Sequence, residues 1–280
     1  MISVRAQAKI NLFLQVIGKR DDGYHEIDSI LQSISLFDQI TLSENSSGIQ
    51  LTVSDRFIPL DHRNTAFKAA QIFFDKTGIQ PGVKIDIKKN IPVAAGLAGG
   101  SADAAAVLMG LNRLFKTDLT ESDFLTLGAE VGSDVPFCTV GGTCRCRGRG
   151  EVVVKVDPLP KSYFVLVKPD FEVSTKWVYE NFDLVWIKEK RLVGTHTPYS
   201  SLTLYNDLEK VVFPKYPQVA EVIKRLTRLG CLKAGMSGSG PSVFGLAEDK
   251  KSAEKIAGEL KQEYPQTFAV ESVDRGVNYV

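Results

Sequence analysis

The sequence contains few cysteines and histidines, which limits the kinds of site that it can build. Its 280 residues include three histidines and four cysteines, which are Cys138, Cys144, Cys146 and Cys231. Four cysteines without paired C-x-x-C spacing are too few for a disulfide scaffold. No histidine stands beside Cys144 and Cys146 to complete a zinc site. We therefore expect reduced, partly buried thiols and a cytoplasmic protein.

Long apolar runs and an excess of charge of one sign are also missing. No run of about 18 apolar residues is present, so we expect no membrane-spanning helix. The first residues include Arg5 and Lys9 between apolar positions, which is not the pattern of a signal peptide. Thirty-four Lys and Arg oppose 33 Asp and Glu, a formal charge of +1. This balance argues against a nucleic-acid partner, and any anionic ligand must be bound locally.

The apolar pattern predicts an α+β fold in both halves of the chain. Apolar residues occupy every even position from Ile2 to Val16, which is typical of a half-buried strand. Further strands are predicted at residues 34–42, 49–53, 83–87, 163–167, 243–246 and 268–273, and helices at 64–78, 102–115, 120–131, 175–181, 218–229 and 252–264. The prolines at 158 and 160 suggest a boundary, so we expect domains 1–157 and 158–280. Residues 187–198 are polar enough to be a surface insertion.

The first candidate site is a glycine-rich segment that leads into a helix. Residues 92–106 read PVAAGLAGGSADAAA, with Gly96, Gly99 and Gly100 ahead of Ser101. Glycines allow backbone to approach a ligand, and the free N–H groups and dipole of a first helical turn favour phosphate. Ser101 could cap the helix or contact phosphate or a metal. The alternative is a plain turn with a serine cap.

A second glycine cluster and three polar residues complete the candidates. Residues 235–240 read GMSGSG and precede a predicted strand, so the cluster is either a tight turn or a partner of the first loop in one cleft. Lys9 and Asn11 lie two residues apart on one face of the first strand. Asp134, in the turn GSDVPF, could face them. A solvated lysine and a turn-stabilising aspartate are the alternatives.

Three of these motifs resemble the GHMP superfamily of small-molecule kinases. They are AKINLFL at residues 8–14, the glycine segment at 92–106 and AGMSGSGPSVFGL at 234–246. GKRDDGYHEI at 18–27 and GSDVPF resemble, within that superfamily, the kinases whose substrate is 4-diphosphocytidyl-2-C-methylerythritol. The resemblance implies an N-terminal ATP-binding domain like domain 2 of ribosomal protein S5, a ferredoxin-like C-terminal substrate-side domain, and a cleft between them.

The resemblance also implies an activity and a set of site residues. The activity is transfer of the ATP γ-phosphate to the 2-hydroxyl of that substrate, on the non-mevalonate route to isoprenoid precursors. Asp134 matches the proposed base and Lys9 its partner, while Asn11, Tyr24, His25 and Tyr179 match the substrate pocket. Asn64 and Lys89 match residues near the adenine, although a helix cap and a solvated lysine remain open for them. The nucleotide loop comprises Pro92, Val93, Ala94, Ala95, Gly96, Leu97, Ala98, Gly99, Gly100, Ser101 and Ala102.

The expected cofactors and partners follow from the same resemblance. They are ATP, Mg²⁺ and a cytidine-diphosphate sugar alcohol. Ser101 is one residue that could bind the Mg²⁺. The protein is expected to be a monomer or a weak homodimer. Rival functions are another kinase of the superfamily, acting on homoserine or a mevalonate derivative, and a ligand sensor without activity. The GYHEI stretch and Tyr179 favour a substrate with a base. A dinucleotide-dependent oxidoreductase is disfavoured because neither glycine cluster has the G-x-G-x-x-G form after a strand.

Overall fold

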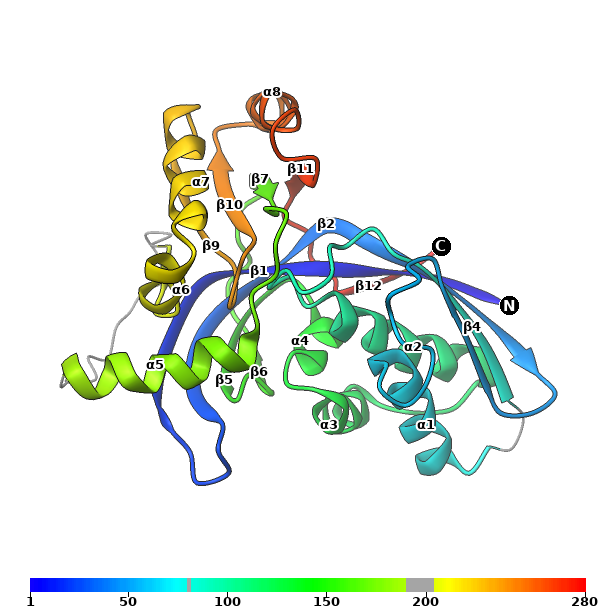
Figure 1. The fold of residues 1–280 in the computed structure, drawn as a ribbon. Coiled ribbons are helices and arrows are strands. Elements are labelled where there is room, and N and C mark those ends of the chain that lie inside the picture. Colours follow the sequence, from blue (N-terminus) through cyan, green and yellow to red (C-terminus); the bar gives the residue numbers. More distant parts are fainter. Residues whose placement is uncertain (80–81, 190–203) are drawn as a thin grey trace.

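Two β-sheets with helices packed against them make up the protein (Figure 1). The computed structural model describes residues 1–79, 82–189 and 204–280. Within these ranges the expected α+β architecture is confirmed. The predicted surface insertion at 187–198 lies largely outside the described residues.

The first sheet is built on two long antiparallel strands, β1 (Ile2–Lys19) and β2 (His25–Asn45). Its other strands are β3 (Ile49–Val53), β4 (Gly82–Lys88), β5 (Thr143–Gly148), β6 (Val152–Lys155), β8 (Tyr205–Asn206) and β12 (Val277–Tyr279). Its helices, below the sheet in Figure 1, are α1 (Thr65–Thr77), α2 (Gly99–Phe115), α3 (Glu121–Val131) and α4 (Val135–Val140). Because β8 and β12 both pair with β1, the second half of the chain returns to the first sheet.

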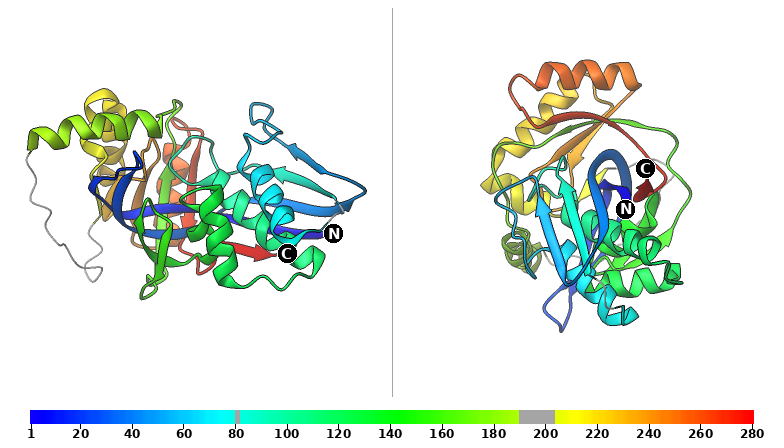
Figure 2. Two further views of the ribbon diagram at one scale, coloured as in Figure 1. Left: turned by 90° about the horizontal axis from the view of Figure 1, so that it is seen from below. Right: turned by 90° about the vertical axis from the view of Figure 1, so that its right-hand side faces the viewer.

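The second sheet has the order β11-β7-β10-β9, and all its pairs are antiparallel. Its strands are β7 (Tyr163–Val167), β9 (Lys233–Met236), β10 (Val243–Ala247) and β11 (Thr267–Glu271). The helices of this half are α5 (Thr175–Glu189), α6 (Glu209–Lys215), α7 (Pro217–Arg228) and α8 (Lys250–Leu260). Figure 2 shows this lobe beside the lobe that carries α1 to α4. The predicted division at residue 157 stays a prediction.

Strand β7 illustrates how the two lobes are joined, because both of its faces are buried. Phe164 and Leu166 belong to the hydrophobic core around the first sheet, whereas Val165 and Val167 belong to the core beneath α7 and α8. Successive side chains of a strand point to opposite faces, so one strand can contribute to two cores. Strand β7 therefore connects the hydrophobic cores of the two lobes.

Helices and strands with clear local signals lie close to their predicted positions. Asn64 caps α1 by accepting a hydrogen bond from the Ala66 amide at 2.8 Å, and Gly78 ends the helix with a left-handed φ of 68°. Thr120 and Asp123 form the capping box of α3. The prediction for the first strand needs correction, because its polar face is also buried at Gln7, Lys9 and Asn11.

All four cysteines are free and buried, as their scarcity suggested. Burial raises the pKa of each thiol, to about 11 for Cys144 and Cys231. In the described ranges, no group of three or more His, Cys, Asp or Glu side chains could hold a metal ion by itself. No helix in those ranges is long and apolar enough to cross a membrane.

Candidate active site

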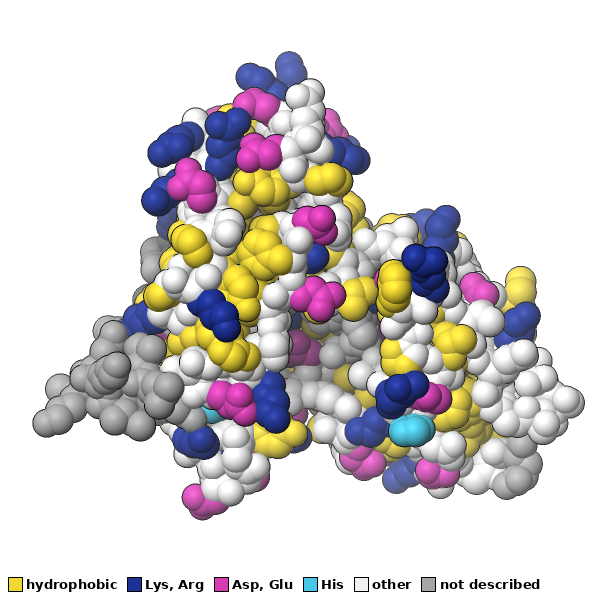
Figure 3. All heavy atoms as spheres, in the orientation of Figure 1, with side chains coloured by type: hydrophobic (Ala, Val, Ile, Leu, Met, Phe, Trp, Pro, Cys, Tyr) yellow, Lys and Arg dark blue, Asp and Glu magenta, His cyan; other side chains and the backbone are white. Residues whose placement is uncertain are grey.

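A cavity of about 940 Å³ lies where the two lobes meet, and Figure 3 shows the surface hollowed between them. The predicted site residues share this cavity except Ser101 and Ala102, which are not among those that line it. Those that line it are Lys9, Asn11, Tyr24, His25, Asn64, Lys89, Asp134, Tyr179 and the loop residues Pro92, Val93, Ala94, Ala95, Gly96, Leu97, Ala98, Gly99 and Gly100. The fold therefore brings predicted site residues from Lys9 to Tyr179 into one site.

The first glycine segment forms a tightly wound loop, residues 92–98, which we call the phosphate loop. Ala94, Gly96 and Ala98 all have positive φ, at 50°, 74° and 56°. Helix α2 begins at Gly99, three residues earlier than predicted, and Ala98 is its N-cap without a side-chain hydrogen bond. Ser101 therefore lies inside the first turn and does not cap the helix. The first N–H groups of α2 consequently face the loop without a side-chain cap.

The second glycine cluster packs directly against the phosphate loop. The hydroxyl of Ser237 donates to the carbonyl of Gly96 at 2.9 Å, and the Ser242 amide donates to Ala95 at 3.3 Å. A Cβ built on Gly96 would lie only 2.2 Å from the carbonyl oxygen of Ser237. The two loops thus share one cleft, and the close approach requires glycine at position 96.

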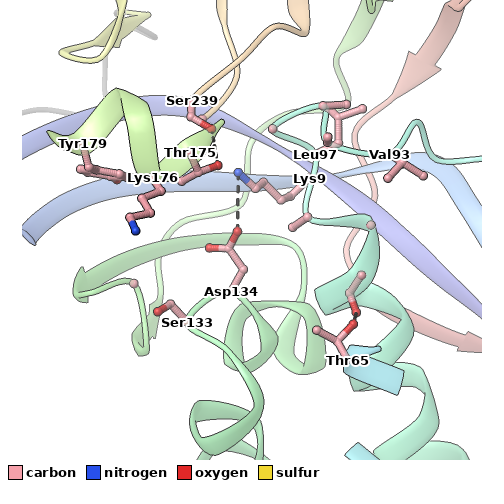
Figure 4. A pocket seen from close by; sticks show the side chains of 18 of the residues that line it. Lys9, Thr65, Val93, Leu97, Ser133, Asp134, Thr175, Lys176, Tyr179 and Ser239 are labelled. Atoms are coloured by element: carbon pink, nitrogen blue, oxygen red, sulfur yellow. Dashed lines mark hydrogen bonds and ion pairs between the residues drawn. The ribbon is translucent and has the colours of Figure 1, made fainter. Parts of the chain in front are cut away.

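Lys9 and Asp134 face one another across the cavity (Figure 4). The ammonium group of Lys9 lies 3.8 Å from the Asp134 carboxylate and donates to Asn11 at 2.6 Å. Lys9 is 4% exposed, so the alternative of a solvated lysine is wrong. Asp134 occupies the N-cap position of α4 but makes no capping hydrogen bond, and its side chain is 37% exposed. Its carboxylate is therefore available to a ligand.

Asn11 and Ser29 hold this pair from behind. The Asn11 amide group donates to the Ser29 hydroxyl at 2.9 Å, and that hydroxyl donates to the Phe13 carbonyl at 2.6 Å. These bonds fix the Asn11 oxygen that accepts from Lys9. A buried ammonium group is stable only when its donors are satisfied, and this chain of hydrogen bonds meets part of that need.

Two aromatic rings close the other end of the cavity. His25 and Tyr179 stack with ring centroids 4.9 Å apart and an interplanar angle of 30°. Rings at this separation are in contact, so a base could stack between them only after they move apart. Burial raises the pKa of the Tyr179 phenol well above its usual value, so the hydroxyl stays protonated. Tyr24 is half exposed and lies under the Arg149 guanidinium, 4.9 Å from ring to cation.

Asn64 and Lys89 line the cavity wall near the phosphate loop, and both have protein partners. Asn64 caps α1 and donates to the Pro59 carbonyl at 2.9 Å. Lys89 bonds the carboxylates of Asp38 and Asp103, the latter at 2.7 Å, and its side chain is 8% exposed. The solvated alternative is therefore wrong for Lys89 too. The helix cap proposed as the alternative for Asn64 is confirmed.

The sequence did not predict several of the cations that line the cavity. The described lining contains six Lys and Arg but three Asp and Glu, although Arg63, Lys89, Arg149 and Lys176 also have carboxylate partners. The unpredicted cations are Lys19, Arg63, Arg149 and Lys176. Figure 4 shows Lys176 projecting from α5 into the space between Tyr179 and Asp134. Cations in the wall of a cavity can interact with ligands that carry several phosphates.

Comparison with known proteins assigns this architecture to a family of kinases. The model described as GHMP kinases N terminal domain matches residues 64–142, and that described as GHMP kinases C terminal matches 196–266. A 4-diphosphocytidyl-2-C-methyl-D-erythritol kinase of Clostridium botulinum (strain Alaska E43 / Type E3) is 41% identical, covering 97% of this chain and 100% of its own. The enzyme of that name from Moorella thermoacetica is 43% identical, covering 98% and 99%.

Solved structures agree with the sequence comparison. A crystal structure of 4-(cytidine 5'-diphospho)-2C-methyl-D-erythritol kinase has a TM-score of 0.82 and 32% identity, covering 97% of this chain and 99% of that one. A homoserine kinase from Cytophaga hutchinsonii has a TM-score of 0.76 at 21% identity, covering 100% and 97%. The second likeness shows the shared fold alone.

Proposed function

Because this chain belongs to the GHMP kinase family, and within it to the 4-diphosphocytidyl-2-C-methyl-D-erythritol kinases, we propose that one cavity aligns ATP and the cytidyl substrate for direct transfer. The enzyme phosphorylates the 2-hydroxyl of 4-diphosphocytidyl-2-C-methyl-D-erythritol in the non-mevalonate route to isoprenoid precursors. The observation that carries this conclusion is identity of about 40% over the full length. The roles of individual residues below are our proposal.

Asp134 orients the acceptor hydroxyl and accepts its proton in this proposal. The hydroxyl oxygen bonds to the γ-phosphorus, the bond from that phosphorus to the β-phosphate oxygen breaks, and ADP leaves. The ammonium group of Lys9, 3.8 Å from Asp134, offsets negative charge that spreads over the transferred group. Asn11 holds Lys9 in place and lies beside the acceptor. Alignment and charge stabilisation supply most of the rate in phosphoryl transfer.

The phosphate loop and the start of α2, from Pro92 to Ala102, bind the ATP phosphates in this proposal. The helix N-terminus without a side-chain cap and the position of the loop in the cavity wall support that role, because free N–H groups at a helix start favour phosphate. The adenine contacts that family membership suggests for Asn64 and Lys89 stay a prediction.

Magnesium fits this cavity as an ion that arrives with the nucleotide. Mg²⁺ is commonly bound by one or two carboxylates and by substrate phosphates rather than by a full protein cage. Asp134 and Glu180 are the described lining carboxylates that do not bond Lys89, and either would be suited to share such an ion, whereas Ser101 is not among the lining residues. When bound, the ion neutralises charge on the phosphates.

Tyr24, His25 and Tyr179 form the cytidine end of the cavity. Lys176 projects into the space between this end and the pair of Lys9 and Asp134 (Figure 4). In this proposal the diphosphate of the substrate lies in that space. His25 can both donate to and accept from a cytosine edge. Tyr179 and His25 separate to let the base stack, which couples substrate binding to a movement of α5.

His25→Ala is expected to raise the KM for the cytidyl substrate about 10- to 100-fold while the KM for ATP changes less than about twofold, because the base loses a buried hydrogen bond. Steady-state kinetics with each substrate varied in turn measures both constants. His62→Ala is the matched control, since His62 is exposed and is not among the lining residues. Equal effects of His25→Ala on the two constants would contradict the cytidine pocket.

A further inference from the structure

Three charged side chains form a buried cluster behind the phosphate loop. Lys89, just after β4, bonds both Asp38 of β2 and Asp103 of α2. Side-chain exposure is 8% for Lys89, 0% for Asp38 and 7% for Asp103. Buried charges are costly unless paired, so a cluster of this kind beside a ligand loop calls for an explanation.

The cluster fastens both ends of the phosphate loop. The second oxygen of Asp38 accepts the backbone amides of Asn90 at 2.5 Å and Ile91 at 2.8 Å, which directly precede the loop. Asp103 lies on α2, the helix into which the loop leads, and Lys89 joins the two carboxylates. A Cβ on Gly99 would lie 3.3 Å from the Lys89 ammonium nitrogen, so this side chain also packs against the first residue of α2. The entry and exit of the loop are thereby tied to one cation.

The protonation of Asp103 sets the charge of the cluster. Burial raises the pKa of its carboxyl to about 8, with the charge of Asp38 acting in the same direction and that of Lys89 against it. One of its oxygens, Oδ1, is buried without a hydrogen-bond partner among the described residues. Although burial lowers the pKa of Lys89, the two carboxylates together raise it above its usual value. Burial raises the pKa of the neighbouring Cys138 thiol on α4 well above its usual value, so this thiol adds no charge beside the cluster near pH 7.

We propose that Asp38 is a positioning residue for ATP, which acts by holding the phosphate loop and the Lys89 side chain in their binding conformation rather than by contacting the nucleotide. This inference rests on the proposed role of the loop in ATP binding. Lys89 and Asp103 line the cavity, whereas Asp38 is fully buried and is not among the lining residues. An effect of Asp38 on ATP must therefore pass through the loop or through Lys89.

Equilibrium binding of ATP, measured by calorimetry without the acceptor substrate, tests the proposal. Asp38→Asn should weaken ATP binding roughly 10-fold, as expected when preorganisation of a loop is lost, while binding of the cytidyl substrate changes less than about twofold. Asp86→Asn is the control, because Asp86 on the neighbouring β4 is exposed and bonds Thr52. Unchanged ATP affinity in a folded Asp38→Asn protein, or equal weakening for both ligands, would overturn the proposal.

The pH dependence of ATP binding in Asp103→Asn supplies a second test, because a merely structural role of Asp103 would not change that dependence. As pH rises through about 8, Asp103 ionises and adds a negative charge behind the loop, so the wild-type Kd for ATP should rise several-fold between about pH 6 and about pH 9. The Asp103→Asn profile should be flatter. Parallel pH profiles of the two proteins would contradict the proposal. If the Asp38→Asn protein does not fold, this second test takes the place of the first. Since no turnover is measured, a failure of the proposed acceptor specificity would leave these results unaffected.

Discussion

Asp134→Asn is expected to lower kcat by about 10²- to 10⁴-fold without unfolding the protein, because the acceptor hydroxyl loses the group that orients it and takes its proton. Asn keeps the size of the side chain but cannot accept the proton. The N-cap position of Asp134 carries no capping hydrogen bond, so its loss should not destabilise α4. Single-turnover kinetics at saturating ATP and cytidyl substrate measures the chemical step directly.

Lys9→Met should give a loss of the same order, and the Asp134→Asn, Lys9→Met double variant should be little worse than either single one. Residues that act as a unit in one step are not additive in their effects on rate. Asp170→Asn, at an exposed aspartate outside the cavity lining, is the matched control and should keep normal turnover. Near-normal kcat in either folded single variant would remove the pair from the reaction.

Gly96→Ala is expected to lower the free energy of unfolding by about 2 to 4 kcal/mol and to weaken ATP binding. Gly96 has a φ of 74°, which an L side chain adopts at a cost. The new methyl group would also lie 2.2 Å from the Ser237 carbonyl oxygen, which forces the two glycine loops apart. Denaturant unfolding and nucleotide calorimetry measure the two effects.

Gly258→Ala is the control for that substitution. Gly258 lies in α8 with no atom within 4 Å of its added Cβ, so alanine there should be neutral or stabilise by up to about 1 kcal/mol. If Gly96→Ala behaves like Gly258→Ala, the contact between the loops does not hold the site together.

Local signals predicted the elements that carry them. Asn64 and Gly78 bracket α1, and the alternation of Val83, Ile85 and Ile87 marks β4, because caps and period-2 burial depend on neighbours in sequence. Strand β5 was missed although it alternates as well. Its buried Cys144 and Cys146 alternate with the charged Arg145 and Arg147, and the strand has no large aliphatic or aromatic residue, so the pattern resembles a polar loop.

Pairings across long stretches of sequence could not be predicted in this way. Strand β12 has three residues and owes its position to hydrogen bonds with β1 at the other end of the chain. Within the site, Lys9 and Asp134 were joined by family resemblance, not by spacing. The burial of Lys89 depends on Asp38 and Asp103, which come from different elements, so no local pattern signals it.

The unpredicted cations of the cavity also depend on contacts between segments that are far apart in the sequence. Arg149 and Lys176 belong to no motif in the sequence, and each lines the cavity because of how β5, β6 and α5 pack around it. The cation-rich lining forms only when these segments pack together. It explains how a chain of formal charge +1 can accommodate two ligands with several phosphates.

The most direct test of the central claim is ADP release measured with four acceptors, 4-diphosphocytidyl-2-C-methyl-D-erythritol, homoserine, mevalonate and phosphomevalonate. Because the cavity has an aromatic end suited to a base, kcat/KM for the cytidyl substrate should exceed that for each other acceptor by at least about 10³-fold. Comparable kcat/KM for homoserine or a mevalonate derivative, or no ADP release with the cytidyl substrate, would contradict the account.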